Sequence, residues 1–208
     1  EQYNKAPIYI PYGTKIERCV SEDILRKYRL EKEKYILFVG RLVPEKGVHD
    51  LIEAFGKVDT SLKLVIVGGD PFDEKYERSL KSRATKNTKF LGFVYSKDYE
   101  ELCKGAYLYV TPSKLEGTSP ALLAAMGYGN CVLASDIPGN LEVAGDAGLF
   151  FQAGNVKDLC DKLEYLLNNH DVVEAWRKKA VERVKELYDW DRVTDQLEKV
   201  YLSLMRRF

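Results

Sequence analysis

The sequence predicts an α/β protein built on a doubly wound, six-stranded parallel sheet with helices on both faces. Six short runs rich in β-branched and aromatic residues recur along the chain, at 35–39, 62–67, 89–91, 107–110, 131–134 and 148–151. Most of these runs are continuously apolar, which is typical of strands buried on both faces of a sheet. Helical patterns lie between them, and strands that alternate with helices form βαβ units.

The helices are predicted from apolar spacing and from end signals. Between 48 and 58, apolar side chains recur at the i, i+3, i+4 spacing of one helix face. Ser119 followed by Pro120 predicts the start of a helix that runs to about 126, and its uniformly apolar surface implies burial. Asn155 is predicted to cap a further helix, and two more are expected at 173–188 and 192–205.

Composition excludes several classes of function. The 208 residues include 32 basic and 32 acidic side chains, so no net positive charge favours nucleic acid or an anionic membrane. No apolar run approaches the roughly 20 residues needed to span a bilayer. The opening residues EQYNK contain neither an initiator methionine nor a signal-peptide pattern, so we expect the chain to be part of a longer protein.

The cysteines and histidines show no metal-site spacing. Cys19, Cys103, Cys131 and Cys160 form no C-x-x-C motif. Cys131 and Cys160 lie in apolar stretches and are interpreted as small core residues, which favours a reducing, cytoplasmic setting. His49 is expected in the first turn of its helix, and His170 lies far away in sequence, so neither is expected to be catalytic.

The loop after the first strand is the first candidate site. It carries Arg41 and Lys46 between Gly40 and a helix that begins at about Gly47. A helix N-terminus offers free N–H groups and a partial positive charge, and two cations beside it could hold a diphosphate. The alternative is a solvated loop in which Arg41 pairs with Glu45.

The loop after the fourth strand, 113–120, is the second candidate. Glu116 could accept hydrogen bonds from sugar hydroxyls, and the amides of 117–119 could approach an anion at the start of the following helix. The alternative is a capped helix with an exposed glutamate.

The ends of the second and third strands carry weaker signals. The segment Gly68-Gly69 permits a tight turn but lacks the G-x-G-x-x-G spacing, which disfavours a dinucleotide-dependent enzyme such as a sugar epimerase. Backbone groups at Phe93 and Val94 could read the edge of a nucleobase, although such a segment is more often only strand and core.

Taken in order, these segments resemble the C-terminal domain of retaining, GT-B type glycosyltransferases of the large group 1, or family 4, class. That domain is Rossmann-like and forms one half of the GT-B fold. The matching segments are 8–13, 38–41 with 45–47, 64–68, 90–94, 116–120 with 126–127, and 146–150. Each segment alone is weak evidence, but the ordered set is specific and covers nearly the whole chain.

The resemblance implies a domain that binds a UDP-, GDP- or TDP-type sugar for metal-independent transfer, without a cofactor. Arg41 and Lys46 would bind the diphosphate and stabilise the leaving group, and Glu116 would hold hydroxyls of the donor sugar. These three would be the catalytic residues. The other donor-binding residues would be Gly40, Gly69, Phe93, Val94, Gly117, Thr118, Ser119 and Pro120.

The resemblance also implies a division of the chain. Residues 1–16 would form an interdomain connection, 17–189 the nucleotide-sugar-binding domain, and 190–208 a helix that crosses towards an N-terminal domain. That domain would hold a carbohydrate or glycolipid acceptor, so the isolated chain is expected to be inactive. The whole protein would be cytoplasmic, with a peripheral position at the cytoplasmic membrane face as an option. Apolar residues of the last helix should then be partly exposed, namely Val193, Leu197, Val200, Tyr201 and Leu204.

One position departs from the family motif, which has a second glutamate after seven intervening residues. Counted from Glu116, that position is Ala124, where the family's glutamate usually binds the ribose hydroxyls. Alanine accepts no hydrogen bond, and the loss of a charge-assisted bond costs about 1.5–3 kcal/mol. Three interpretations follow. Donor binding is weaker, another group binds the ribose in place of the missing glutamate, or the chain is a non-catalytic binding or scaffold domain with a degenerate donor site.

Overall fold

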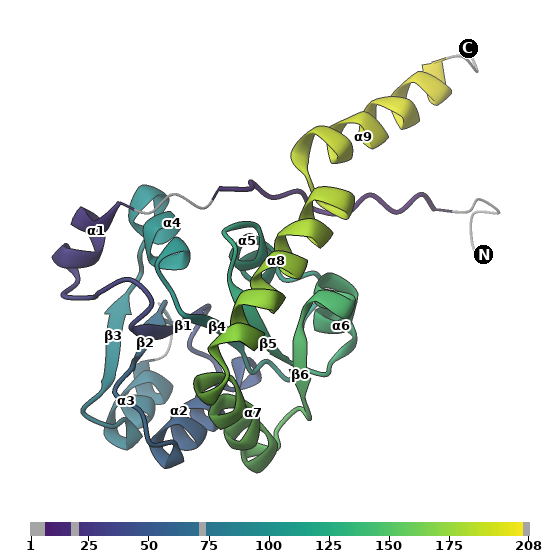
Figure 1. Ribbon diagram of the computed structural model, residues 1–208. Coiled ribbons are helices and arrows are strands. Elements are labelled where there is room, and N and C mark those ends of the chain that lie inside the picture. The colour runs from purple at the N-terminus through teal and green to yellow at the C-terminus, as the bar shows by residue number, and fades with distance from the viewer. Residues whose placement is uncertain (1–6, 18–20, 71–73, 206–208) are drawn as a thin grey trace.

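The computed structural model describes residues 7–17, 21–70 and 74–205, and six parallel strands form one sheet within them (Figure 1). The strands are β1 Tyr35–Val39, β2 Lys63–Val67, β3 Thr88–Gly92, β4 Leu108–Thr111, β5 Cys131–Ser135 and β6 Leu149–Phe151. All six strand predictions are confirmed, with ends that differ by at most one residue.

The strand order is β3-β2-β1-β4-β5-β6. The chain moves outward from β1 to β3 and then returns to place β4 on the other side of β1. Leu37 of β1 therefore pairs with Val65 on one side and with Tyr109 on the other. The loops that follow β1 and β4 meet where the strand order reverses, which is where doubly wound sheets bind ligands.

Helices cover both faces of the sheet, as predicted (Figure 1). One core lies under α1 Glu22–Lys27, α4 Ser96–Lys104, α5 Pro120–Gly127, α6 Pro138–Ala144 and α8 His170–Leu187. The other lies under α2 Val48–Lys57, α3 Glu74–Arg83 and α7 Val156–Asn168. Alternate strand residues divide between the two cores, so that Leu37 faces the first and Phe38 the second.

Short 3-10 helices and the last α-helix complete the chain. The 3-10 helices are η1 Pro44–Lys46 and η2 Gly145–Ala147, and the last α-helix is α9 Trp190–Met205. The predicted caps are confirmed, because Ser119 Oγ accepts from Leu122 N at 3.4 Å and Asn155 Oδ1 accepts from Asp158 N at 3.1 Å.

Four helices were not predicted from the sequence, namely α1, α3, α4 and α6. The reason is clearest for α3, in which Leu80 is the one buried residue among ten and the apolar stripe is therefore too thin to recognise. The last two helices also begin two or three residues earlier than predicted, at His170 and Trp190.

The described cysteines are core residues. Cys103, Cys131 and Cys160 are buried free thiols, which confirms the interpretation of the last two, and Cys19 lies outside the described residues. Burial raises the pKa of Cys103 and of Cys131 to about 12, so both remain protonated. No helix in the described part of the chain has the length and apolar character needed to cross a bilayer.

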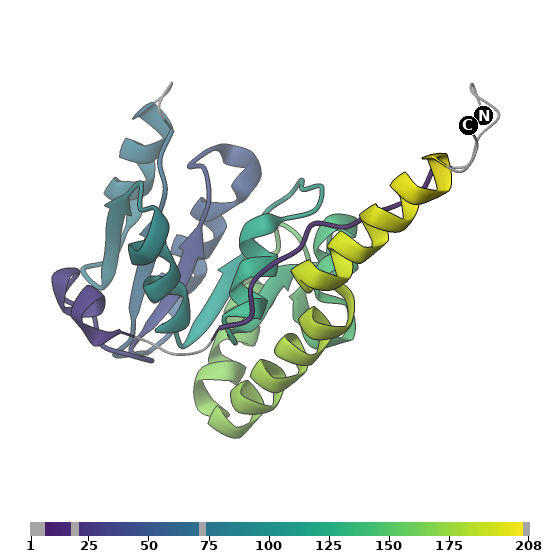
Figure 2. The ribbon, with the colours of Figure 1, turned by 90° about the horizontal axis from the view of Figure 1, so that it is seen from above.

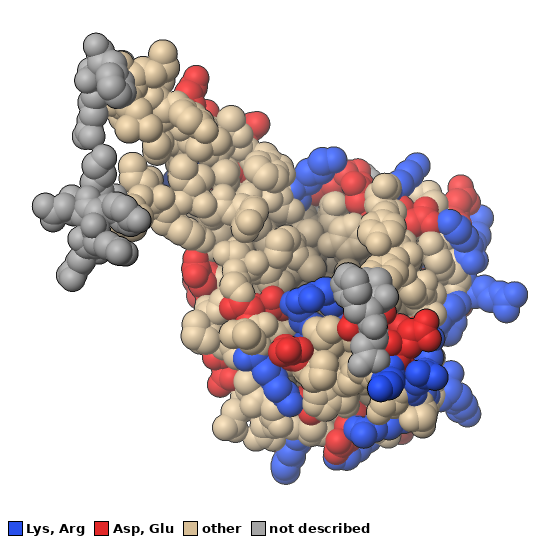
Figure 3. All heavy atoms as spheres, turned by 180° about the vertical axis from the view of Figure 1, so that it is seen from behind, with Lys and Arg blue, Asp and Glu red and all other residues tan. Residues whose placement is uncertain are grey.

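The described ends of the chain leave the body on the same side and diverge from a common base, and we call the two ends together the arm (Figure 1 and Figure 2). At its base Thr14 N donates to Tyr188 O at 2.8 Å, and Gly13 lies against the ring of Trp190. The side of the arm seen in Figure 3 is largely uncharged. Its exposed large apolar side chains are Ile8, Tyr9, Tyr12, Trp190, Leu197, Tyr201, Leu202, Leu204 and Met205.

The predicted exposure of the last helix is correct for most of the named residues. Leu197, Tyr201 and Leu204 are exposed, and Val200 is half-buried. The prediction is wrong for Val193, which is only 5% exposed because it lies in the first turn of α9, where the arm leaves the body.

Candidate functional site

The loops after β1 and β4 touch along their backbones, and we call residues 40–47 and 112–119 the loop pair. Gly47 has a φ of +65°, and a Cβ at this position would lie 2.1 Å from the carbonyl oxygen of Pro112. Only glycine permits both this conformation and this approach. Lys114 N also donates to Glu45 O at 2.7 Å. The two segments predicted separately from the sequence therefore form one structural unit.

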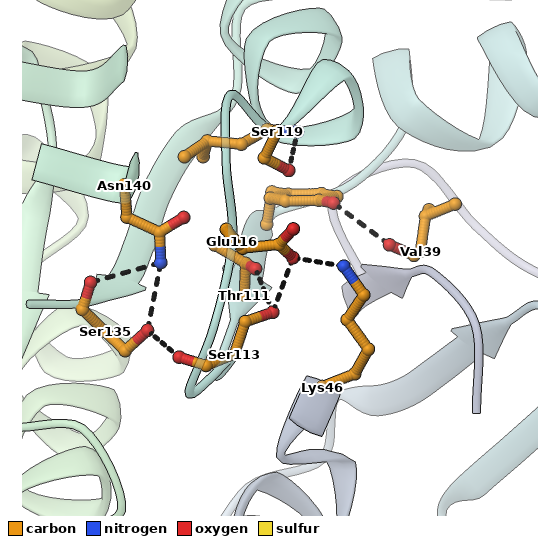
Figure 4. Close-up of polar contacts among 10 residues, drawn as sticks. Val39, Lys46, Thr111, Ser113, Glu116, Ser119, Ser135 and Asn140 are labelled. Atoms are coloured by element: carbon orange, nitrogen blue, oxygen red, sulfur yellow. Dashed lines mark hydrogen bonds and ion pairs between the residues drawn. The ribbon is translucent and has the colours of Figure 1, made fainter. Parts of the chain in front are cut away.

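Lys46 and Glu116 form an ion pair across the loop pair (Figure 4). Ser113 Oγ donates to the same glutamate oxygen, Oε1, at 2.8 Å. The side chains of Lys46 and Glu116 are 19% and 12% exposed, so water screens this pair less than a surface ion pair. The alternative of an exposed Glu116 is therefore excluded. Both groups have further hydrogen-bonding capacity for a ligand that brings phosphates and hydroxyls.

Buried polar groups fix the backbone beneath Glu116 (Figure 4). Ser135 Oγ at the end of β5 donates to the carbonyl oxygen of Ser113 at 2.5 Å. Asn140 of α6, which is fully buried, donates to the backbone oxygen of Ser135 at 3.1 Å and to its Oγ at 2.9 Å. These bonds connect three segments, so the position of Glu116 is set by the body of the domain.

Lys114 connects the loop pair to α2. Its Nζ lies 3.0 Å from Asp50 Oδ2 and 3.3 Å from His49 Nε2, while His49 Nδ1 lies 2.6 Å from the hydroxyl of Tyr76. Burial lowers the pKa of His49, opposed by Asp50 and reinforced by Lys114. His49 is in the first turn of α2, as predicted. The roles of Asp50 and Lys114 were not predicted, because in sequence alone both residues are indistinguishable from ordinary surface charges.

Arg41 is exposed, and within the described residues its side chain makes no hydrogen bond or ion pair. The alternative in which Arg41 pairs with Glu45 is therefore not observed. Beneath it the ends of β1 and β2 are in close contact, because Gly68 has a φ of +125° and a Cβ there would lie 1.9 Å from the carbonyl oxygen of Gly40.

The turn before α5 presents backbone groups beside Glu116. Gly117 is exposed, and a Cβ there would meet no atom within 4 Å. Thr118 is half-buried, whereas Ser119 is buried with its hydroxyl used as the cap. Pro120 has no N–H, so it can only contribute contact surface. The start of α5 therefore combines an open approach with the positive end of a helix dipole.

A groove between α4 and α5 lies on one side of the loop pair and encloses about 540 Å³; we call it the α4–α5 groove. It is lined at the strand ends by Val39 and Val94, and it also touches Tyr95. From α4 come Ser96, Tyr99 and Glu100, and from α5 come Pro120, Ala121, Ala124 and the adjoining Tyr128. The segment 13–15 and Trp190 complete its lining.

A second cavity, of about 420 Å³, lies by α3, and we call it the α3 cavity. It is lined by 68–70, Glu74, Glu77, Arg78, Lys81, Gly92 and Phe93. The predicted donor residues are therefore divided, since Val94, Pro120 and Ala124 line the groove while Gly69 and Phe93 line the α3 cavity.

Metal ligands do not gather in the part of the chain that the structure describes: it holds no group of three or more His, Cys, Asp or Glu placed to bind an ion. Metal independence of the reaction stays a prediction.

Comparison with known proteins supplies the family context. Residues 20–183 match the family described as "Glycosyl transferases group 1". The chain is 27% identical over 190 residues to O-antigen chain mannosyltransferase B of Escherichia coli, covering 87% of this chain and 49% of that protein. It is 31% identical over 180 residues to an uncharacterised glycosyltransferase of Methanocaldococcus jannaschii, covering 84% and 46%. The chain thus spans about half the length of these curated relatives.

A solved structure shares the fold. The HepE protein of Anabaena, in complex with UDP, matches with a TM-score of 0.80 and 21% identity, covering 88% of this chain and 52% of that one. HepE has also been solved in complex with UDP-glucose. At this identity the likeness shows a shared fold, and the present chain covers about half of the HepE chain.

Proposed function

The chain belongs to the glycosyl transferases group 1 family, and we propose that it is the part of a retaining glycosyltransferase that binds the nucleoside-diphosphate sugar. The observation that carries this proposal is the Lys46–Glu116 pair at the switch point of the sheet. A sugar joined to a diphosphate needs a cation for its phosphates and an acceptor for its hydroxyls, side by side.

The phosphate end of the donor would lie on the loop pair. Lys46 supplies a point charge, Arg41 is exposed beside it, and the amides before α5 add the positive end of a helix dipole. Gly117 leaves open space for an anion to approach. Donor binding would replace the Lys46–Glu116 contact with contacts of Lys46 to phosphate and of Glu116 to sugar hydroxyls.

The nucleoside end would lie in the α4–α5 groove. Two of its lining residues are next in sequence to the loop pair: Val39 directly precedes Gly40, and Pro120 directly follows Ser119. The groove therefore adjoins both loops of the pair. Tyr95 and Tyr99 offer aromatic surface on which a base can pack. This arrangement supports the predicted role of Val94 more directly than those of Gly69 and Phe93, which line the α3 cavity.

In the proposed transfer, the bond between the anomeric carbon and the phosphate oxygen breaks, and an acceptor hydroxyl bonds to that carbon and gives its proton to the departing diphosphate. Negative charge develops on the departing diphosphate, where Lys46 and Arg41 would stabilise it. These cations and the start of α5 would supply the positive charge without a metal ion or cofactor. Retention of configuration is part of the proposal and rests on the resemblance to retaining enzymes.

The acceptor side of the reaction would belong to an N-terminal domain. The relatives are about twice as long as this chain, and the exposed apolar residues of the arm form a surface suited to such a partner. A carbohydrate or glycolipid acceptor would be held largely there, so the chain alone would bind donor without transfer. The three buried thiols are consistent with a cytoplasmic protein.

Calorimetric titration of the chain with UDP, GDP and TDP tests the donor site. At least one of the three should bind, and Lys46→Ala should weaken that binding about tenfold or more, because a charge-assisted contact is lost. The matched control is Lys157→Ala on α7, whose side chain is 83% exposed, and it should leave affinity unchanged.

The alternative is a scaffold domain that keeps the fold without binding a donor, and Ala124 is the observation that favours it. It predicts that none of the three nucleotides binds at millimolar concentration while the chain remains folded. That result would exclude the proposed function.

A further inference from the structure

The two helices of the α4–α5 groove present different chemistry to it. The groove-lining side chains of α5 are Pro120, Ala121 and Ala124, which have no polar atoms. The adjoining Tyr128 is a neutral phenol, since burial raises its pKa to about 12. From α4, by contrast, Ser96 and Glu100 line the groove one turn apart. A ligand hydroxyl in the groove therefore finds its strongest side-chain acceptor on α4.

The carboxylate of Glu100 has hydrogen-bonding capacity to spare. Its nearest cation is the buried ammonium of Lys104, which lies 3.1 Å from Glu17, 3.2 Å from Glu101 and 3.9 Å from Glu100. The Lys104 side chain is 2% exposed and that of Glu101 is 5% exposed, whereas that of Glu100 is 28% exposed. At 3.9 Å the contact of Glu100 with Lys104 is longer than a hydrogen bond, so the carboxylate of Glu100, which lines the groove, keeps lone pairs for a ligand.

The two ends of the groove also differ in charge. Three carboxylates lie around the ammonium of Lys104 at the Glu100 end, and the groove-lining Lys15 adds one further cation, so this end keeps a net negative charge that disfavours phosphate. The opposite end adjoins Lys46 and the start of α5, which attract phosphate. A nucleoside diphosphate is therefore favoured in one orientation, with its phosphates at the loop pair and its sugar hydroxyls within the groove.

We propose that Glu100 recognises the ribose hydroxyls of the nucleotide, so that the groove selects a ribonucleoside diphosphate over its 2′-deoxy counterpart. This inference rests on the proposed function, because it assumes that the diphosphate binds at Lys46. Ala124 leaves room for the ribose but provides no acceptor, and Glu100 supplies the acceptor from the other helix. Glu100 is thus a specificity-determining residue that compensates for alanine at position 124.

The test compares two matched pairs of probes, UDP with 2′-deoxy-UDP and GDP with 2′-deoxy-GDP, by calorimetry. For the base that binds, the unaltered chain should prefer the ribonucleotide by about tenfold, the effect of one hydrogen bond to a charged acceptor. Glu100→Ala should remove that preference by weakening the ribonucleotide alone. Glu77→Ala, which removes a glutamate from the α3 cavity, is the matched control and should keep the preference.

The outcomes separate this inference from the proposed function. If the nucleotides bind but Glu100→Ala weakens both members of a pair equally, or neither, Glu100 does not read the ribose and the inference is overturned. If the unaltered, folded chain binds none of these nucleotides and no TDP, the proposed function itself fails, whereas binding of TDP alone, a deoxyribonucleotide, overturns only the inference. Thermal melting of Glu100→Ala checks the fold, which should persist because Lys104 keeps Glu17 and Glu101.

Discussion

The loop pair and the α4–α5 groove adjoin each other at one edge of the sheet, yet they are built differently. The loop pair is fixed by a backbone contact at Gly47, by Ser135 and Asn140, and by two ion pairs whose carboxylates are largely buried. The groove is lined mainly by small and aromatic side chains, with few polar contacts across it. The comparison indicates that charge stabilisation requires fixed donors, whereas apolar packing on a nucleoside tolerates an open surface.

The largest effect is expected from Gly47→Val, which disrupts the backbone contact that fixes the loop pair. The added side chain would meet the backbone of Pro112 and would also force valine into a left-handed conformation. We expect a loss of about 3 kcal/mol in the free energy of unfolding, measured in urea, and loss of nucleotide binding. Gly117→Ala, where a Cβ meets open space, should change stability by less than about 0.5 kcal/mol. Equal effects of the two variants would contradict the rigid loop pair.

Lys114→Met should have the next largest effect, because among the described residues it leaves the carboxylate of Asp50 only His49 as an ion-pair neighbour. The Asp50 side chain is 10% exposed, so the unpaired charge should cost about 2 kcal/mol of stability. The double variant Lys114→Met/Asp50→Leu should recover part of that loss. A urea-unfolding cycle over the single and double variants measures the coupling, and additive effects would show that the ion pair does not hold the loops.

A smaller effect is expected from acid through His49. Burial lowers its pKa, so the folded chain binds a proton less readily than the unfolded chain. Stability should therefore be unaffected by this group above the ordinary histidine range, near pH 6.5, and should fall as the pH drops below it. His49→Gln should reduce the slope of stability against pH between about pH 6.5 and 5. The control His170→Gln should retain the slope of the unaltered chain. An unchanged slope in His49→Gln would show that His49 does not cause the loss of stability in acid.

The smallest effect is expected from Phe93→Ala, which enlarges the α3 cavity and affects the groove only by removing the ring stacked on Tyr95. Nucleotide affinity should change by less than about twofold, as for a residue outside the contact surface. Ala124→Leu, which fills part of the groove, should weaken binding about tenfold. Calorimetry on both variants decides between the two cavities. A larger loss of nucleotide affinity in Phe93→Ala than in Ala124→Leu would place the nucleoside in the α3 cavity.

The sequence predicts the loop pair better than the groove for a physical reason. Lys46 and Glu116 each lie in a short motif beside a strand end, so their chemistry can be recognised locally. Their contact cannot be recognised locally, since it depends on β4 returning to pair with β1. The pairing of Lys114 with Asp50 is hidden for the same reason.

The groove is assembled from five separate segments, and one of its walls is α4, a helix that was not predicted from the sequence. Glu100 lies on α4, a helix of nine residues whose apolar face consists only of Tyr99, Leu102 and Cys103, too short a pattern to recognise among its charged residues. The alanine at position 124 was recognised as a departure from the family motif, but its consequence depends on what faces it across the groove. Val193 shows the same limitation, since its burial depends on where α9 leaves the body.

The central claim is that a nucleoside diphosphate binds with its phosphates on the loop pair and its nucleoside in the α4–α5 groove. A crystal structure of the chain with the nucleotide that binds most tightly tests it most directly. We predict a phosphate oxygen about 3 Å from Lys46 Nζ, with the base against Val94 and the ribose between Ala124 and Glu100. A nucleotide whose base lies against Phe93 in the α3 cavity, with Lys46 still paired to Glu116, would contradict the account.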